Sequence, residues 1–219
     1  MEKEKLVKLY KALYKCTDLD KIRPRPLLTG INHQKAGGQW LLTVTNGNIA
    51  VRAYAPEELI PGANDGATIS QDGTRQDGRF PNIDSVVPKQ APTSVITMPI
   101  KELTKIADTL LKLGNYTSKH KNNRVNNVLV LSDAYLDAGQ LKVALGVMAL
   151  YADKVKIEIR KQGPSGYSNT NTVIRADGTS TFAIMCNREP DEEFDYTIDQ
   201  VKEMMSAKPE EPKKSWFEQ

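Results

Sequence analysis

Two prolines seven residues apart constrain the middle of the chain more than any other feature. Pro81 and Pro88 lie in the segment 77–89, which also contains the apolar residues Phe80, Ile83, Val86 and Val87. Because each proline fixes φ and removes a backbone donor, neither a regular helix nor a central strand can run through this segment. The sequence therefore predicts an extended segment that packs its apolar side chains against another part of the chain. The turn signal Asp77-Gly78 opens it.

Length and composition bound the class of protein. The chain has 219 residues, of which 39% are hydrophobic and 26% charged, as in a soluble protein with one large or two small domains. It contains no run of about 18 apolar residues, so we expect no membrane span. The first residues lead into an amphipathic pattern rather than an apolar signal core, which indicates a cytoplasmic protein. Cys16 and Cys186 form neither a metal motif nor a disulfide framework.

The charge of the chain is unevenly distributed. Residues 189–219 carry ten acidic residues against four lysines, so the other 188 residues account for a net charge of +9 within the total of +3. A basic body with an acidic tail suits a polyanionic partner, and such a tail could compete for the same surface. Plain solubility is the alternative explanation. We expect the tail 189–219 to be partly disordered.

Two expected helices share one layout. Residues 3–16 and 101–113 each place apolar side chains at helical spacing on one side and lysines on the other, whereas a third helix over 140–152 is apolar nearly all round. The lysine faces could contact phosphates, although ordinary surface helices also carry charged outer faces. A basic loop at 118–124 is a weaker candidate of the same kind. The candidate DNA-binding residues are Lys8, Lys11, Lys15, Lys101, Lys105, Lys112, Lys119, Lys121 and Arg124.

The remaining patterns predict strands and a two-lobed organisation. Residues 40–45 and 49–54 flank the tight-turn signal Asn46-Gly47, and residues 154–161 alternate between apolar and charged side chains. We therefore expect an α+β fold with antiparallel sheets and helices packed on one face. The expected units are an N-terminal lobe 1–76 with a flexible loop 56–76, a connector 77–93, a C-terminal lobe 94–188 and the acidic tail 189–219.

The sequence lacks the usual signatures of catalysis. His33 and His120 have no nucleophile motif around them, and no Cys/His spacing indicates a metal site. Asp133 and Asp137 are a weak hint of acid–base or divalent-metal chemistry. No glycine-rich phosphate loop is present. We therefore predict a binding protein rather than an enzyme, with no catalytic residues, metal or cofactor.

Three stretches, in this order, resemble the bacterial sliding clamp, the β subunit of DNA polymerase III. Residues 25–30 with 42–51 resemble the family's middle-domain pattern, in which a strand ends in Thr-Asp-Gly-His-Arg-Leu-Ala. The segment 77–89 is similar to the Asp-Gly-Arg-Phe-Pro-Asp-Tyr segment that joins the clamp's last two domains. Residues 140–161 and the closing stretch 182–188 resemble the clamp's final helix and terminal strands.

This resemblance implies a fold and a function. Its helices would line a basic central hole and its sheets would form the outside of a ring, with about two clamp-type lobes in this shortened chain. The implied function is that of a processivity factor, from a phage or mobile element, which encircles or cradles duplex DNA non-specifically and recruits polymerase. Three two-lobed subunits could complete a six-lobed ring. The alternative is a module that never closes a ring and binds only a protein partner.

In that family the middle-domain turn, the joining segment and the terminal strand build a partner-peptide pocket. Apolar walls would hold leucine or phenylalanine anchors of a polymerase or clamp-loader peptide. Ser85 stands where the family has arginine, and Cys186 where it has proline. For Leu28, Ile49 and Val86, core packing is the alternative role. Carried over by position, the pocket residues are Leu28, Thr45, Gly47, Ile49, Pro81, Val86, Met185, Cys186 and Arg188.

Overall fold

One long antiparallel sheet organises the structure. The computed structural model describes residues 1–17, 25–117, 127–160, 171–188 and 195–207. Nine strands pair in the order β5-β4-β1-β2-β3-β11-β10-β9-β6, every neighbouring pair antiparallel. The strands are β1 (Gly30–Ala36), β2 (Gln39–Thr45), β3 (Ile49–Pro56), β4 (Thr68–Ser70), β5 (Arg75–Gln76), β6 (Ser94–Pro99), β9 (Lys154–Ile159), β10 (Asn171–Ala176) and β11 (Phe182–Cys186).

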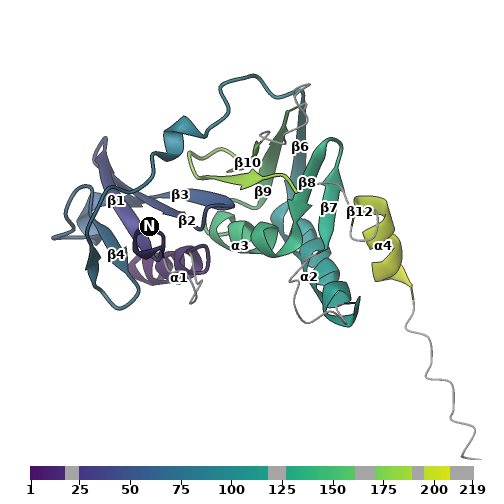
Figure 1. Ribbon diagram of the computed structural model, residues 1–219, viewed down its shortest axis with the longest axis horizontal. Helices are drawn as coiled ribbons and strands as arrows, with labels where there is room; N and C mark the ends of the chain where they lie inside the picture. Colours follow the sequence, from purple (N-terminus) through teal and green to yellow (C-terminus); the bar gives the residue numbers. More distant parts are fainter. Residues whose placement is uncertain (18–24, 118–126, 161–170, 189–194, 208–219) are drawn as a thin grey trace, which may run out of the picture.

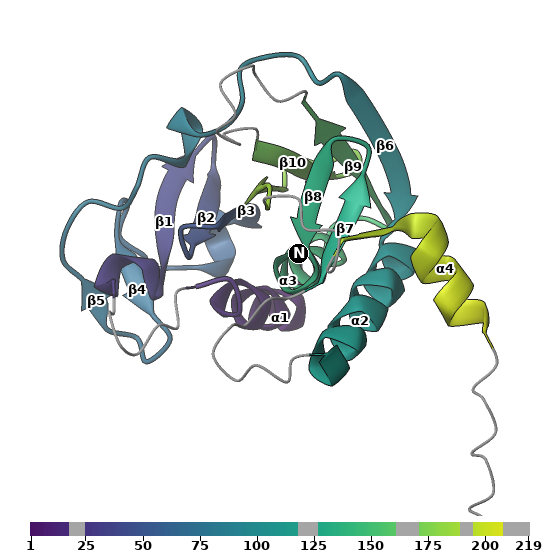
Figure 2. The same cartoon turned by 45° about the vertical axis from the view of Figure 1, so that its right-hand side comes forward.

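Three helices cover one face of this sheet. They are α1 (Lys3–Tyr14), α2 (Ile100–Thr117) and α3 (Ala138–Met148), and in Figures 1 and 2 α3 lies between the other two. Their apolar stripes pack on the strand residues that point toward them, such as Leu103 and Leu141 with Val51 and Ile157, all fully buried in one core. Alternation along each strand leaves the other face free for different contacts.

The connector crosses the opposite face of the same sheet. After β5 the chain runs over the strands on the side away from the helices and returns to the sheet edge as β6 (Figures 1 and 2). It contains the short 3₁₀ helix η3 (Ile83–Ser85). Phe80, Ile83 and Val87 of the connector pack against outward-facing strand residues in a second, smaller apolar cluster. The extended, packed segment expected from the two prolines is therefore confirmed.

A small second sheet closes the C-terminal part. Its strands β7 (Val128–Leu131) and β8 (Ala134–Asp137) are antiparallel, and β12 (Asp195–Thr197) pairs with β7 in parallel. The helix α4 (Ile198–Ser206) follows β12 directly and packs against α2 through Val201, which is fully buried. A strand at 195–197 was not expected from the sequence.

The expected α+β class, with antiparallel sheets and helices on one face, is confirmed. Two details differ from expectation. The segment 56–76 contains β4, β5 and the 3₁₀ turn η2 (Glu57–Leu59), so part of it extends the sheet. The third helix begins at Ala138 because the carboxylate of Asp137 caps it, accepting hydrogen bonds from the backbone N–H groups of Gly139 (2.9 Å) and Gln140 (3.0 Å).

The two expected lobes share the nine-stranded sheet, since β3 pairs with β11. The division of the chain into lobes remains a prediction. None of the helices in the described parts of the chain has both the length and the apolarity needed to span a bilayer.

Candidate functional site

The connector is fixed to the sheet at its entry and along the 3₁₀ turn. Gly78 has φ +120°, a conformation that favours glycine, and a Cβ there would come within 2.9 Å of a methyl carbon of Leu27 and push that side chain aside. Asn82 caps η3 by accepting a hydrogen bond from the backbone N–H of Asp84 (3.1 Å). Ile83, 5% exposed, is the connector residue most deeply buried against the sheet. The middle of the connector is therefore held in one conformation.

A buried arginine ties the connector to the strand beneath it. The guanidinium of Arg52 donates to both carboxylate oxygens of Asp84, at 2.6 and 3.3 Å, and its Nε donates to Thr43 Oγ1 at 3.3 Å. The strand register explains these contacts of Arg52, because Arg52 of β3 lies opposite Thr43 of β2 and opposite Phe182 of β11. The guanidinium lies 5.6 Å from the Phe182 ring centroid, a favourable cation–π distance.

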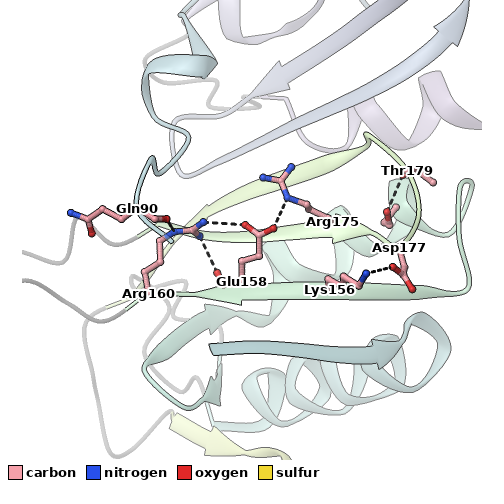
Figure 3. A network of polar contacts seen from close by, with 8 residues as sticks. Gln90, Lys156, Glu158, Arg160, Arg175, Asp177 and Thr179 are labelled. Atoms are coloured by element: carbon pink, nitrogen blue, oxygen red, sulfur yellow. Dashed lines mark hydrogen bonds and ion pairs between the residues drawn. The ribbon is translucent and has the colours of Figure 1, made fainter. Parts of the chain in front are cut away.

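An ionic network continues across the same face and holds the far end of the connector (Figure 3). Glu158 accepts hydrogen bonds from Arg175 (2.6 Å) and from Arg160 (3.1 Å), and Arg160 also donates to the backbone carbonyl of Gln90 (2.8 Å). Burial opposes ionisation of Glu158, but the hydrogen bonds and charges of the two arginines lower its pKa below the ordinary value. Glu158 is therefore ionised and anchors both arginines.

Between the connector and the end of β11 lies an apolar cavity of about 410 Å³. Its walls combine Val86, which is 45% exposed, with outward-facing residues of β3 and β11. Such a half-open apolar hollow is the usual receptor for an apolar side chain of a bound peptide. The lining residues are Arg25, Leu28, Thr45, Gly47, Asn48, Ile49, Ala50, Pro81, Asn82, Ile83, Ser85, Val86, Asn171, Ile184 and Cys186.

The tight turn after β2 shapes the rim of this apolar cavity. Gly47 has φ +93°, and a Cβ there would lie 2.8 Å from an Nη atom of Arg25. The same arginine donates to the carbonyl of Asn46 at 2.6 Å. Thr45 Oγ1 donates to the Ile49 carbonyl (2.8 Å) and accepts from the Gly47 N–H (3.1 Å), which closes the turn. The backbone conformation therefore favours glycine, and any larger residue would also displace the guanidinium of Arg25.

The structure brings together most of the residues assigned to the pocket by resemblance. Seven of the nine line the apolar cavity: Leu28, Thr45, Gly47, Ile49, Pro81, Val86 and Cys186. Met185 is fully buried in the core on the helix side of the sheet, and Arg188 does not line the cavity either. The strand alternation of β11 gives the reason, since Ile184 and Cys186 point to the connector side and Met185 points away.

Sequence reasoning missed some lining residues. Ile184 could have been found from that alternation, and Arg25 lies in the same Arg-Pro stretch that carried the resemblance. Asn171 lies far from the motifs along the chain, and its side chain reaches the Val86 carbonyl at 3.3 Å. Burial raises the pKa of the Cys186 thiol, so this wall of the cavity is uncharged.

The helix face opposite the connector carries the candidate DNA-binding lysines. Six of them lie on α1, at its C-terminal cap or on α2, and all six are exposed and form no ion pair with another described residue; they are Lys8, Lys11, Lys15, Lys101, Lys105 and Lys112. On α3, Lys142 pairs with Asp108 of α2 at 2.6 Å and is neutralised. Lys119, Lys121 and Arg124 lie outside the described residues.

Comparison with known proteins finds the same arrangement in solved structures. The DNA polymerase III β subunit of Pseudomonas aeruginosa superposes with a TM-score of 0.64 and 12% identity, over 87% of this chain and 65% of that chain. The β subunits of Streptococcus pyogenes (TM-score 0.62, 9% identity) and Thermotoga maritima (0.58, 10%) match over the same shares. No protein-family model matches the sequence, and no curated protein matches it.

These matches bear on the fold alone, because the identities are below 15%. The chain spans slightly less than two thirds of the length of the sliding clamps that it matches. The chain therefore has the fold of the bacterial sliding clamp, the DNA polymerase III β subunit, over about two thirds of that protein's length.

Proposed function

We propose that this protein holds duplex DNA non-specifically against its helix face and captures a partner peptide, from a polymerase or a clamp loader, in the apolar cavity under the connector. One observation carries the proposal: the two surfaces occupy opposite faces of one sheet, so DNA and peptide can bind at the same time. The proposed activity is binding, without catalysis. The described residues contain no group of three potential metal ligands.

The DNA side of the proposal depends on unpaired charge. Lys8 and Lys11 on α1, and Lys101 and Lys105 on α2, recur along each helix at spacings that place them on one exposed stripe. Lysines without carboxylate partners are available to phosphates and release counterions when they bind them. Contacts of this kind carry no sequence information, which suits a protein that moves along DNA.

The peptide side depends on shape and burial. Seven residues that the clamp resemblance assigns to a peptide pocket converge on one cavity, and Val86 stays 45% exposed at its wall. An exposed valine beside buried apolar residues is what an anchoring leucine or phenylalanine would cover. The connector that carries this wall is fixed through Asp84 and Gln90, so the cavity is largely preformed.

The test of DNA binding compares two double variants with the same change in net charge. Lys8→Glu with Lys105→Glu alters the helix face, whereas Lys89→Glu with Lys154→Glu alters exposed residues of the connector and of β9. The affinity for duplex DNA is measured at several salt concentrations. Each phosphate contact contributes about 0.9 to the slope of log K against log salt, so we expect the helix-face variant to flatten this slope by about 2. The control variant should leave the slope unchanged. Equal slopes for the two variants would refute DNA binding by the helix face.

A second candidate function is peptide capture alone. It is favoured by one observation: the apolar cavity is fully formed within the described residues, whereas an exposed lysine face is common on surface helices. Under this alternative, DNA affinity is unaffected by the helix-face variant while peptide binding persists. The same titrations therefore separate the two functions.

A further inference from the structure

A second cavity lies under the same connector, beside the apolar one. Its volume is about 490 Å³, and it shares Pro81, Asn82 and Ile83 with the apolar cavity, so these three residues form a common wall. The character of the floor changes from one cavity to the other. Beneath the second cavity the strands β1, β2 and β3 present Asn32, Gln34, Thr43 and Arg52. We call it the polar cavity.

One buried group in the polar cavity has an unused hydrogen-bonding atom. Asn32 is 2% exposed, and its amide nitrogen donates to Thr68 Oγ1 and to the Gly66 carbonyl, both at 3.1 Å. Its Oδ1 is buried and accepts no hydrogen bond from any residue that the structure describes. Because this oxygen is enclosed, a bound ligand does not reach it in this conformation, but with the Asn32 amide it makes the floor of the cavity polar.

The charges around the polar cavity do not balance. Two arginines, Arg52 and Arg79, face a single lining carboxylate, Asp84, which Arg52 already holds through two hydrogen bonds. Arg79 is exposed and forms no ion pair with a described residue. A carboxylate beside Arg79 would complete the site, and hydrogen bonds between guanidinium and carboxylate are among the strongest in proteins.

We propose that the polar cavity receives an acidic residue of the same partner peptide whose apolar anchor occupies the neighbouring cavity. Its carboxylate pairs with Arg79 next to Arg52. The inference rests on the proposed function, because both cavities bind one peptide. It adds a specificity element: the partner must carry a negative charge at a fixed distance from its anchor.

A peptide fits this site better than a free anion does. Inorganic phosphate could pair with the arginines alone, whereas a peptide that carries both an apolar anchor and a carboxylate fills the two cavities together, because they share one wall. The shared wall of three residues sets the spacing between the acidic residue of the peptide and its apolar anchor. An extended peptide that crosses this wall covers about 3.3 Å per residue, so a few residues separate its acidic residue from its anchor.

The experiment uses a panel of fluorescent decapeptides. Each contains a Leu-Phe anchor and a single glutamate, placed from one to five residues before or after the anchor, and each has a twin with glutamine in place of glutamate. Anisotropy titrations with the full chain give a glutamate-to-glutamine affinity ratio for every position. We expect a ratio of about five or more at a spacing of a few residues on one side of the anchor, and ratios near one elsewhere.

Two variants locate the effect. Arg79→Gln should reduce the ratio to about one without weakening the glutamine peptide. Arg75→Gln should leave it unchanged, because Arg75 is an exposed arginine on the neighbouring β5 and lines neither cavity. Both arginines are exposed, so neither variant should unfold the chain.

The outcomes distinguish this inference from the proposed function. One outcome is that Val86→Asp abolishes peptide binding, while the glutamate and glutamine peptides bind with equal affinity at every spacing. In that case the inference is overturned and the proposed function stands. A preference for glutamate that survives Arg79→Gln also overturns it. If no peptide of the panel binds the wild-type chain, the inference and the peptide-binding part of the proposed function are both refuted.

Discussion

At the residue scale, Arg52 explains why the connector has one position. Its side chain is 9% exposed, and it lies between Phe182 below and Asp84 above. An arginine this deeply buried needs a charged partner, since an isolated buried charge is strongly unfavourable. That partner is a connector residue. The sheet and the connector are therefore joined by a charge pair in addition to the apolar contacts of Ile83.

Replacing Asp84 by asparagine tests this charge pair. The variant keeps the shape of the side chain but leaves Arg52 without a counter-charge. We therefore expect the free energy of unfolding in urea to fall by about 1–2 kcal/mol. The Asp84 side chain is 66% exposed, so the loss stays below the upper range for hydrogen bonds between charged groups. Asp77→Asn is the matched control in the same connector, where the exposed carboxylate has no ion pair with a described residue, and it should change stability by less than about 0.5 kcal/mol. Equal effects of the two variants would contradict the role given to Arg52.

His33 makes a second prediction at this scale, on the dependence of stability on pH. The ring is 3% exposed; its Nε2 lies 2.7 Å from Tyr10 Oη, and its Nδ1 lies 3.0 Å from the Ile31 carbonyl. Burial lowers the pKa of His33 below 6.5, although hydrogen bonds to the backbone oppose this shift. The unfolded chain therefore binds a proton at this residue more readily than the folded chain does.

The sign follows from proton linkage. Since the unfolded state binds more protons at His33, the free energy of unfolding falls as pH decreases below about 6.5. We expect the loss of stability between pH 7.5 and pH 5.5, measured by urea unfolding, to be smaller in His33→Gln than in the wild type. Carboxylates titrate in both proteins, so the difference isolates His33. An identical pH dependence in the two proteins would show that His33 does not titrate differently on folding.

At the element scale, patterning predicted the fold better than the site. The helices were predicted because leucines recur at helical spacing, and the connector because two prolines exclude regular structure. The parallel pairing of β12 with β7 could not be predicted, because a three-residue strand has no periodicity of its own and depends on a partner more than 60 residues away. Met185 was misplaced for a related reason: a motif match does not show toward which face a strand residue points.

Among the α-helices, α4 buries the fewest side chains. Only Val201 of this helix is buried, and Lys202 adds an ion pair with Glu102 of α2 at 2.7 Å. A complete capping box, Thr197 with Gln200, starts the helix directly after β12. Together β12 and α4 cover an edge of β7, whose backbone groups would otherwise be open to another strand.

Two substitutions in α4 test this covering role. Val201→Asp places a charge in a fully buried position, whereas Met204→Asp places the same charge on a side chain that is 39% exposed. We expect Val201→Asp to release β12 and α4, so that amide hydrogen exchange measured by mass spectrometry becomes faster in β7 and α4 but not in α3. Met204→Asp should leave all three unchanged. Unaltered exchange in β7 of Val201→Asp would mean that β12 does not protect this edge.

At the scale of the whole molecule, the sheet and its helices form an arc, with α1 and α2 on the same side of the sheet (Figure 2). Closing a ring by strand pairing between copies requires a free strand at each end. One end of the nine-stranded sheet is β6, with six residues, but the other is β5, with only two. Pairing between them would be limited to a very short ladder, which favours an open cradle over the closed trimer expected from the sequence.

DNA topology distinguishes a cradle from a ring. A ring is trapped on circular DNA and escapes only over the free ends of linear DNA. A cradle dissociates through its open side, at the same rate from circular and from linear DNA. We expect the half-life of the complex, measured by competition with excess duplex at low salt, to be the same on a nicked circular plasmid and on the same plasmid linearised. Light scattering of the free protein should then give the mass of one chain, 24.4 kDa. A threefold mass, with much longer retention on the circle, would instead establish the trimeric ring. In either case the Lys8→Glu, Lys105→Glu variant should shorten retention, because phosphate attraction holds the DNA in both arrangements.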